Sequence, residues 1–149
     1  MRYESLVLEY PHLLIKEVKD IPKGLAGLYT DNMILIDKYR DWYEKHCVLA
    51  EEIGHHETTY GDITNSKSMT NRKLELVARR WGYEKIVSFD NLIECYEMGY
   101  KSLEEVCTHL EITASYLKTS VDHYSSRHGL STRHKGYRIY FDPLFIHRV

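Results

Sequence analysis

The chain has no hydrophobic run of the length that a membrane span needs. Its longest purely aliphatic stretch runs from Met33 to Ile36, whereas a transmembrane helix needs about 20 apolar residues. The N-terminus carries charged residues where a signal peptide would have an apolar core. These two absences lead us to expect a cytoplasmic protein.

The chain also lacks an excess of charge of either sign. Twenty Lys and Arg residues against 22 Asp and Glu residues give a formal net charge of −2. No global electric field therefore attracts nucleic acid or an anionic membrane. A local basic patch is still compatible with these numbers.

Cysteine is scarce, odd in number and widely spaced. Cys47, Cys95 and Cys107 fit neither a disulfide framework nor a C-x-x-C metal-binding pair. We predict that they are buried thiols in a reducing compartment.

Internal repeats, low-complexity tracts and long linkers are absent as well. A length of 149 residues suits one domain, or a small core with an appended subdomain, and is sufficient to bury most of the apolar surface. We expect an α+β protein in which residues 1–99 form the core. Residues 100–149 are expected to form a C-terminal helical subdomain with a terminal strand.

Short apolar runs near the N-terminus predict a small sheet. Residues 2–19 allow either two short helices or a helix and a strand, because Pro11 interrupts their apolar pattern. Residues 24–29 and 33–37 are two apolar runs around a cluster of turn residues at 30–32, which is the signal of a β-hairpin. We therefore expect a small antiparallel β-sheet.

Capping residues and apolar spacing predict the helices. Ser102 and Glu105 form a capping box, and Thr113 can cap the next helix, so residues 102–124 are typical of a helix-turn-helix. Polar and apolar residues alternate over residues 137–141, as in a strand. Earlier in the chain we expect helices over residues 39–58, 71–85 and 88–99, with a polar loop at residues 65–70.

The segment Leu-Ala-Glu-Glu-Ile-Gly-His-His, residues 49–56, has the pattern of a metallopeptidase helix in which one metal-binding histidine is replaced by glutamate. The usual signature, H-E-x-x-H, places two ligands one turn apart, and the glutamate after the first ligand activates the metal-bound water. Glu51 and His55 then form the ligand pair, and Glu52 is the base. A carboxylate oxygen also binds zinc, so the substitution preserves the spacing of the ligands.

A second register would place the ligand pair at Glu52 and His56. Ile53 would then follow the first ligand and could not accept a proton, so we prefer the first register. His56 is rotated by about 100° from His55 on an α-helix. We expect it to border the site, in a supporting position or in contact with substrate. His46 lies on the opposite face of the helix and is not expected to be a ligand.

A catalytic metal site needs a third protein ligand and an open position. The best candidate is Glu75 on the next predicted helix, where the small residue Ala78 lets the two helices approach. On residue chemistry alone, a surface ion pair of Glu75 with Arg79 or Arg72 is the commoner role for such a glutamate.

Three segments share their patterns with one protein family. They are the hairpin segments G-L-A-G-L-Y and N-M-I, the helix C-V-L-A-E-E-I-G-H-H, and the helix containing Glu75, Ala78 and Trp81 with two residues between neighbours. In these features residues 24–81 resemble the ImmA/IrrE family of metallopeptidases, particularly members from phages and mobile elements of Gram-positive bacteria. The resemblance implies a mainly helical, zincin-like core.

In this family two histidines and a later glutamate bind zinc, and the glutamate of the motif is the base. The resemblance therefore implies that Glu51, His55 and Glu75 bind the metal and that Glu52 is the catalytic base. The expected ion is Zn²⁺. Because two carboxylates and one imidazole make a harder and more anionic site, Mn²⁺, Fe²⁺ or an empty site are the alternatives.

The resemblance implies a metal-dependent endopeptidase that cleaves or inactivates a helix-turn-helix repressor and so releases phage or mobile-element genes. Two alternatives stay open. One is an inactive protein that binds the repressor without cutting it, and the other is a DNA-binding regulator that uses residues 102–124. The helix after Thr113 offers Lys118 as its cation and also carries Asp122, too little for several phosphate contacts. We therefore expect a protein substrate, no membrane partner and little direct DNA binding.

Overall fold

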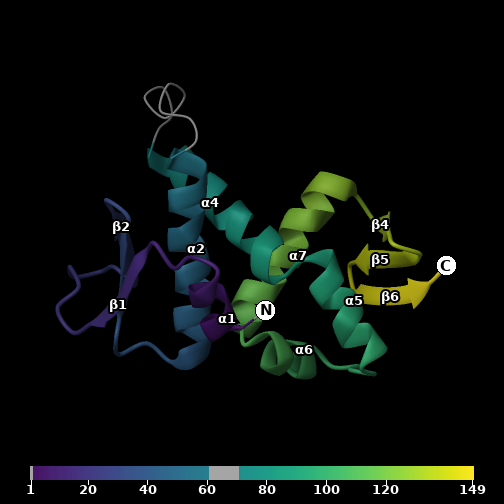
Figure 1. The fold of residues 1–149 in the computed structure, drawn as a ribbon. Coiled ribbons are helices and arrows are strands. Elements are labelled where there is room, and N and C mark those ends of the chain that lie inside the picture. The colour runs from purple at the N-terminus through teal and green to yellow at the C-terminus, as the bar shows by residue number, and fades with distance from the viewer. Residues whose placement is uncertain (1, 61–70) are drawn as a thin grey trace.

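The computed structural model describes residues 2–60 and 71–149. It confirms the α+β class and places one three-stranded sheet at each end of the molecule, with helices between them (Figure 1). The polar loop expected at residues 65–70 lies outside the described residues. The elements are α1 (Tyr3–Leu8), β1 (Leu14–Val18), β2 (Gly27–Thr30), β3 (Met33–Asp37), α2 (Trp42–Tyr60), α4 (Asn71–Ile86), α5 (Phe89–Glu97), α6 (Leu103–Leu110), α7 (Ala114–His128), β4 (Ser131–His134), β5 (Tyr137–Phe141) and β6 (Leu144–Arg148).

The N-terminal sheet is mixed, and the expectation of a purely antiparallel sheet is wrong. β2 and β3 form the predicted hairpin, and Asp31 and Asn32 adopt positive φ angles of 43° and 61° in its turn. Asn and Asp tolerate this conformation, which two-residue hairpin turns require. β1 then pairs with β3 in parallel. Of the two arrangements open for residues 2–19, the structure has the helix followed by a strand.

The C-terminal segment holds more β-structure than the single strand predicted at residues 137–141. β4, β5 and β6 form an antiparallel sheet in the order β4-β5-β6. The two residues between β4 and β5, Lys135 and Gly136, have positive φ angles of 47° and 84°. The chain therefore reverses there in a tight hairpin, although a Lys-Gly turn lacks the usual Asn-Gly or Asp-Gly signal.

The predicted caps of the C-terminal helices are confirmed. The Ser102 side chain accepts a hydrogen bond from the Glu105 amide, and the Glu105 side chain accepts one from the Ser102 amide. Thr113 caps α7 by accepting from the Tyr116 amide. The second helix of the expected helix-turn-helix buries Leu117, Ser120, Val121 and Tyr124.

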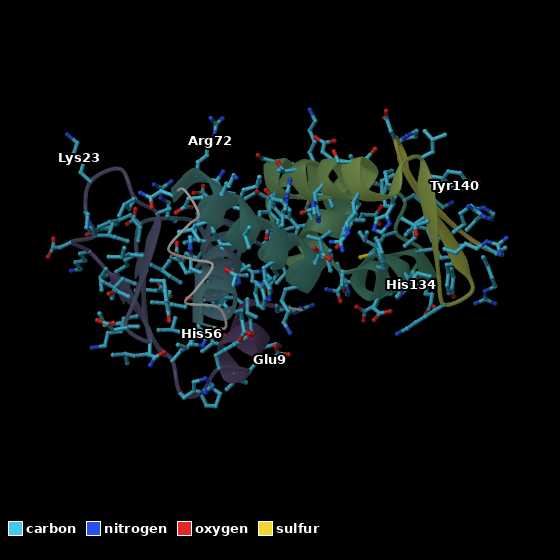
Figure 2. The ribbon with its side chains drawn as sticks, turned by 90° about the horizontal axis from the view of Figure 1, so that it is seen from above. Glu9, Lys23, His56, Arg72, His134 and Tyr140 are labelled. Carbon is cyan, nitrogen blue, oxygen red and sulfur yellow. The ribbon has the colours of Figure 1, made fainter. Side chains whose placement is uncertain are left out.

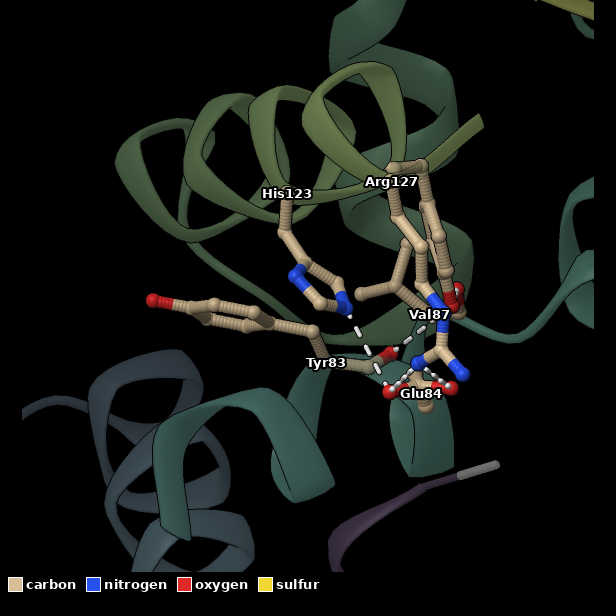
Figure 3. A network of polar contacts seen from close by, with 6 residues as sticks. Tyr83, Glu84, Val87, His123 and Arg127 are labelled. Carbon is tan, nitrogen blue, oxygen red and sulfur yellow. Dashed lines mark hydrogen bonds and ion pairs between the residues drawn. The ribbon is translucent and has the colours of Figure 1, made fainter. Parts of the chain in front are cut away.

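Helix α7 is tied to the end of α4, and this contact joins residues 1–99 to residues 100–149. The Tyr124 hydroxyl donates to the Val87 carbonyl oxygen at 2.8 Å. At the surface, Glu84 lies 3.2 Å from Arg127 Nη1 and 3.3 Å from His123 Nε2 (Figure 3). Most of the buried hydrophobic residues form one cluster that runs from Tyr3 to Ile146.

The three cysteines lie mainly inside the protein. Cys95 and Cys107 are buried, Cys47 is half-buried, and all three are free thiols. Burial raises the pKa of Cys47 to about 12 and the pKa of Cys95 to about 11.

None of the helices that the structure describes combines the length and the hydropathy that a bilayer crossing requires.

Candidate metal centre

Helices α2 and α4 cross at small residues, and this crossing positions the candidate ligands. A Cβ atom added to Gly54 would lie 2.3 Å from the Ala78 carbonyl oxygen. The two backbones can approach this closely because glycine has no side chain there. Leu49, Ala50 and Ile53 turn to the core with no exposed surface. The crossing therefore leaves Glu51 and His55 on the side of α2 that faces the first turns of α4.

A cleft of about 630 Å³ opens beside this crossing. It is lined by residues 24–29, by side chains of α2 and by side chains of α4 between Asn71 and Arg79. Glu51, Glu52, His55 and Glu75 all line it. The four residues that the sequence assigns to metal binding and catalysis thus share one cleft.

Glu51, His55 and Glu75 each offer a ligand atom, and these atoms lie within 4.8 Å of one another. His55 Nε2 is 3.3 Å from Glu75 Oε1. Ligands about 2.1 Å from a tetrahedral zinc ion are about 3.4 Å apart. The His55–Glu75 pair has this spacing, and the whole group of three could hold a metal ion if its more distant ligand atoms move closer together.

The ion pairs around Glu75 differ from the surface role that is commoner for such a glutamate. Glu75 meets His55 across the two helices. Arg79 instead donates from Nε to Glu51 Oε1 at 3.0 Å. The sequence predicts a pairing of Arg79 with Glu75 on its own helix, because a neighbour four residues away is the simplest partner. Arg79 is thus a cleft residue that the sequence did not place in the site.

Three carboxylates crowd this cleft, and their pKa values respond to it. Burial, followed by the charges of Glu51 and Glu75, raises the pKa of Glu52 to about 8. Burial and the neighbouring Glu75 raise the pKa of Glu51, and Arg79 opposes this rise. A divalent cation bound by Glu51 and Glu75 would reverse these effects, because a nearby positive charge favours the ionised carboxylate.

Strand β2 runs directly over Glu52. A Cβ atom added to Gly27 would lie 2.5 Å from Val48 Cγ1 and 3.0 Å from Glu52 Oε2. Glu52 is accordingly buried, with 8% of its surface exposed, although it lines the cleft. Gly27 is a second residue of the site that sequence reasoning did not identify as such. The sequence places Gly27 in the predicted hairpin.

His56 and His46 occupy other places on α2. His56 is buried and does not line the cleft; its Nδ1 atom lies 2.8 Å from the hydroxyl of Tyr29, which does line it. The structure thus places His56 behind the cleft wall. His46 is fully buried on another side of the helix, where Nδ1 is 2.9 Å from the Glu111 carbonyl oxygen. Burial lowers the pKa of His46.

The close crossing can be tested with Gly54→Ala. We expect this change to destabilise the protein by about 1–3 kcal/mol, because the new methyl group forces the two backbones apart. It should also weaken metal binding, since Glu75 moves away with α4. Urea denaturation and metal titration would measure the two effects. Without a clash, alanine would stabilise the helix by about 1 kcal/mol, so a gain in stability would contradict the crossing geometry.

Searches of the known protein families, of the curated proteins and of the solved structures find no match to this chain. The resemblance to the ImmA/IrrE family therefore remains an expectation from the sequence motifs, and the geometry alone indicates a group that could hold a metal ion.

Proposed function

We propose that this protein is a metal-dependent endopeptidase whose metal is held by Glu51, His55 and Glu75. The observation that carries the proposal is the convergence of these three donors within 4.8 Å in an open cleft, with Glu52 buried beside them. Three protein ligands and a free position are the arrangement of a catalytic zinc centre, whereas a structural zinc centre has four protein ligands.

The donor set favours Zn²⁺ and also suits Mn²⁺ or Fe²⁺, because two of the three ligands are carboxylates. When bound, such an ion lowers the pKa of a coordinated water toward about 7 and polarises the scissile carbonyl group. Glu52, which lines the same cleft, would be the general base for the attacking water and would then donate the proton to the leaving nitrogen. Arg79 holds one oxygen of Glu51 and so limits the orientations that this ligand can adopt.

Strand β2 gives the cleft a surface for an extended peptide. Among the described residues it is an edge strand, since the sheet order is β1-β3-β2. The Asp37 amide donates to the Ala26 carbonyl oxygen. Backbone groups alternate between the two sides of an antiparallel strand, so those of Gly27 and Tyr29 point to the free edge. A substrate backbone can add there as a further strand, which is a common mode of peptide recognition.

The substrate that we propose is a helix-turn-helix repressor, and this assignment rests on the ImmA/IrrE resemblance. Cleavage or inactivation of the repressor would release the genes that it controls. The alternative with a specific observation in its favour is an inactive protein that binds the repressor without cutting it. That observation is the Arg79–Glu51 ion pair, in which a side-chain cation already neutralises one of the candidate ligands.

Substitutions of Glu51 distinguish the peptidase from the inactive protein that binds the repressor. Glu51→His recreates the common H-E-x-x-H sequence and releases Arg79, so we expect it to bind zinc more tightly than wild type. Glu51→Ala should bind zinc more weakly and lose cleavage. Zinc would be titrated into the three proteins while a candidate helix-turn-helix repressor is followed by mass spectrometry.

Cleavage that needs zinc and stops with a chelator supports the peptidase. Loss of repressor activity with an intact repressor, unchanged in Glu51→Ala, would instead establish the protein that acts by binding. Equal zinc affinity in all three proteins would show that Glu51 does not touch the metal.

A further inference from the structure

The C-terminal sheet has two unlike faces. Its inner face packs on the helices and buries Tyr137, Ile139, Phe141 and Ile146. Side chains of alternate residues point to the opposite face, and the strand pairing brings them together in two rows. One row holds Ser131, Tyr140 and Phe145, and the other holds Arg133, Arg138 and His147.

Three of the outward side chains are rings that lie side by side. Tyr140 and His147 are nearly parallel, with 16° between their planes and 5.7 Å between their centroids. The Phe145 ring is 6.1 Å from Tyr140 and 6.0 Å from His147. Phe145 is 57% exposed and Tyr140 is 36% exposed. An open hollow of about 570 Å³ is formed by these rings with Asp142 and Pro143.

The other row places two arginines directly opposite each other. Arg133 pairs with Arg138 in the strand register, and like charges in this position repel each other. Arg138 donates to Ser131 Oγ at 3.1 Å, and Arg133 makes no ion pair with any residue that the structure describes. The repulsion is relieved if an anion lies between the two guanidinium groups.

The charged residues of the segment 131–149 also favour an anionic ligand on this face. Asp142, in the turn between β5 and β6, is the one acidic residue in the segment 131–149, which has four basic residues. Two of these four have partners elsewhere: Lys135 pairs with Asp90, and Arg148 lies against Tyr137. Arg133 and Arg138 are therefore the cations of the segment that can receive a ligand on the outer face.

We propose that the outer face of the C-terminal sheet binds single-stranded nucleic acid. Bases would stack on Tyr140, Phe145 and His147, and backbone phosphates would lie against Arg133 and Arg138. Exposed rings beside a cationic row are the combination that such binding needs. Duplex DNA fits less well because its bases already stack on one another. An acidic peptide would use the arginines but would leave the rings without stacking partners.

This face is separate from the metal centre, so the inference does not depend on the proposed peptidase. Figure 2 places Tyr140 at the far end of the molecule from His56 and Lys23. The net charge of −2 and the few cations on the helix after Thr113 argue against DNA binding by the helix-turn-helix. They do not argue against binding by Arg133 and Arg138 on the sheet.

The test is the fluorescence anisotropy of labelled dT12, rU12 and a 12-base-pair duplex, titrated with the full chain at several salt concentrations. We expect one or both single strands to bind more tightly than the duplex, and the comparison of dT12 with rU12 distinguishes DNA from RNA as the source. Tyr140→Ala and Phe145→Ala should each weaken binding about tenfold, within the range measured for loss of one stacking platform. Arg133→Ala should reduce the salt slope by about 0.7.

Two matched controls remove the same side chains elsewhere. Tyr39→Ala deletes a tyrosine that is 73% exposed, and Arg72→Ala deletes an exposed arginine on α4 (Figure 2). Both should bind as wild type does. Tighter binding to the duplex, or equal binding by wild type and Tyr140→Ala, would overturn the proposal. A lack of binding to either single strand would also overturn it, and a concentration-dependent dimer that Phe145→Ala abolishes would then show that the face serves self-association.

Discussion

Replacing His55 with alanine is expected to abolish the binding of a divalent ion, of which the wild-type chain should hold about one. His55 is the single imidazole among the three donors, and it contacts Glu75 on the neighbouring helix. Changes in residues that merely support metal ligands cost about 10- to 100-fold in affinity, so loss of a ligand should exceed about 100-fold. Equilibrium dialysis followed by elemental analysis would measure the bound ion.

The matched control for this variant is His134→Ala. His134 is also a histidine paired with a carboxylate, since its Nε2 lies 2.9 Å from Asp90, but it is in the C-terminal sheet. The control should keep full metal occupancy. If His55→Ala also retains a full equivalent of metal, the assignment of ligands is wrong.

The second large effect is expected for Glu52→Gln, which should fold and bind metal but lose cleavage of the repressor. Glutamine keeps the shape of the side chain under β2 and cannot take up a proton from water. Loss of a general base typically lowers the rate by about 10²–10⁴-fold. Single-turnover cleavage at saturating zinc would measure this loss, and cutting at the wild-type rate would rule out Glu52 as the base.

The same variant has an independent signature in stability. In the folded protein the pKa of Glu52 is raised from its ordinary 4.5 to about 8. The unfolded chain releases this proton at lower pH than the folded chain, so the metal-free protein loses stability as the pH rises from about 4.5 to about 8. Glu52→Gln removes that loss and should be more stable than wild type by roughly 2–4 kcal/mol above pH 8. Urea unfolding in chelator at pH 5 and pH 8.5 would show the difference at the higher pH.

Local signals in the sequence predicted the elements that local interactions determine. The capping box at Ser102, the cap at Thr113 and the hairpin around Asp31 and Asn32 all depend on residues within a few positions of one another. The parallel pairing of β1 with β3 has no such signal, because it joins strands separated by β2 and its connections. The sequence predicted only the central strand of the C-terminal sheet for a related reason: the first hairpin of this sheet turns at Lys135 and Gly136, an uncommon pair for a tight turn.

The candidate site also combines features that the sequence predicts with contacts that it does not predict. The spacing of Glu51 and His55 is a property of one helix, and it could be predicted from the sequence. The meeting of Glu75 with His55 depends on how two helices cross, and Ala78 gave a useful but incomplete indication of it. The partner of Arg79 and the cover that β2 places over Glu52 come from tertiary packing alone. No local pattern specifies such contacts.

Helix α4 makes two sets of contacts, one at the cleft and one with α7. Its first turns carry Glu75 at the cleft, and its last turns carry Glu84, which is tied to α7. Nine residues separate these glutamates, about 14 Å along a helix axis. We expect a helix segment of this length to move as a rigid unit. We expect α4 to couple the position of α7 to the cleft, with the close contact of Gly54 and Ala78 lying between the two glutamates.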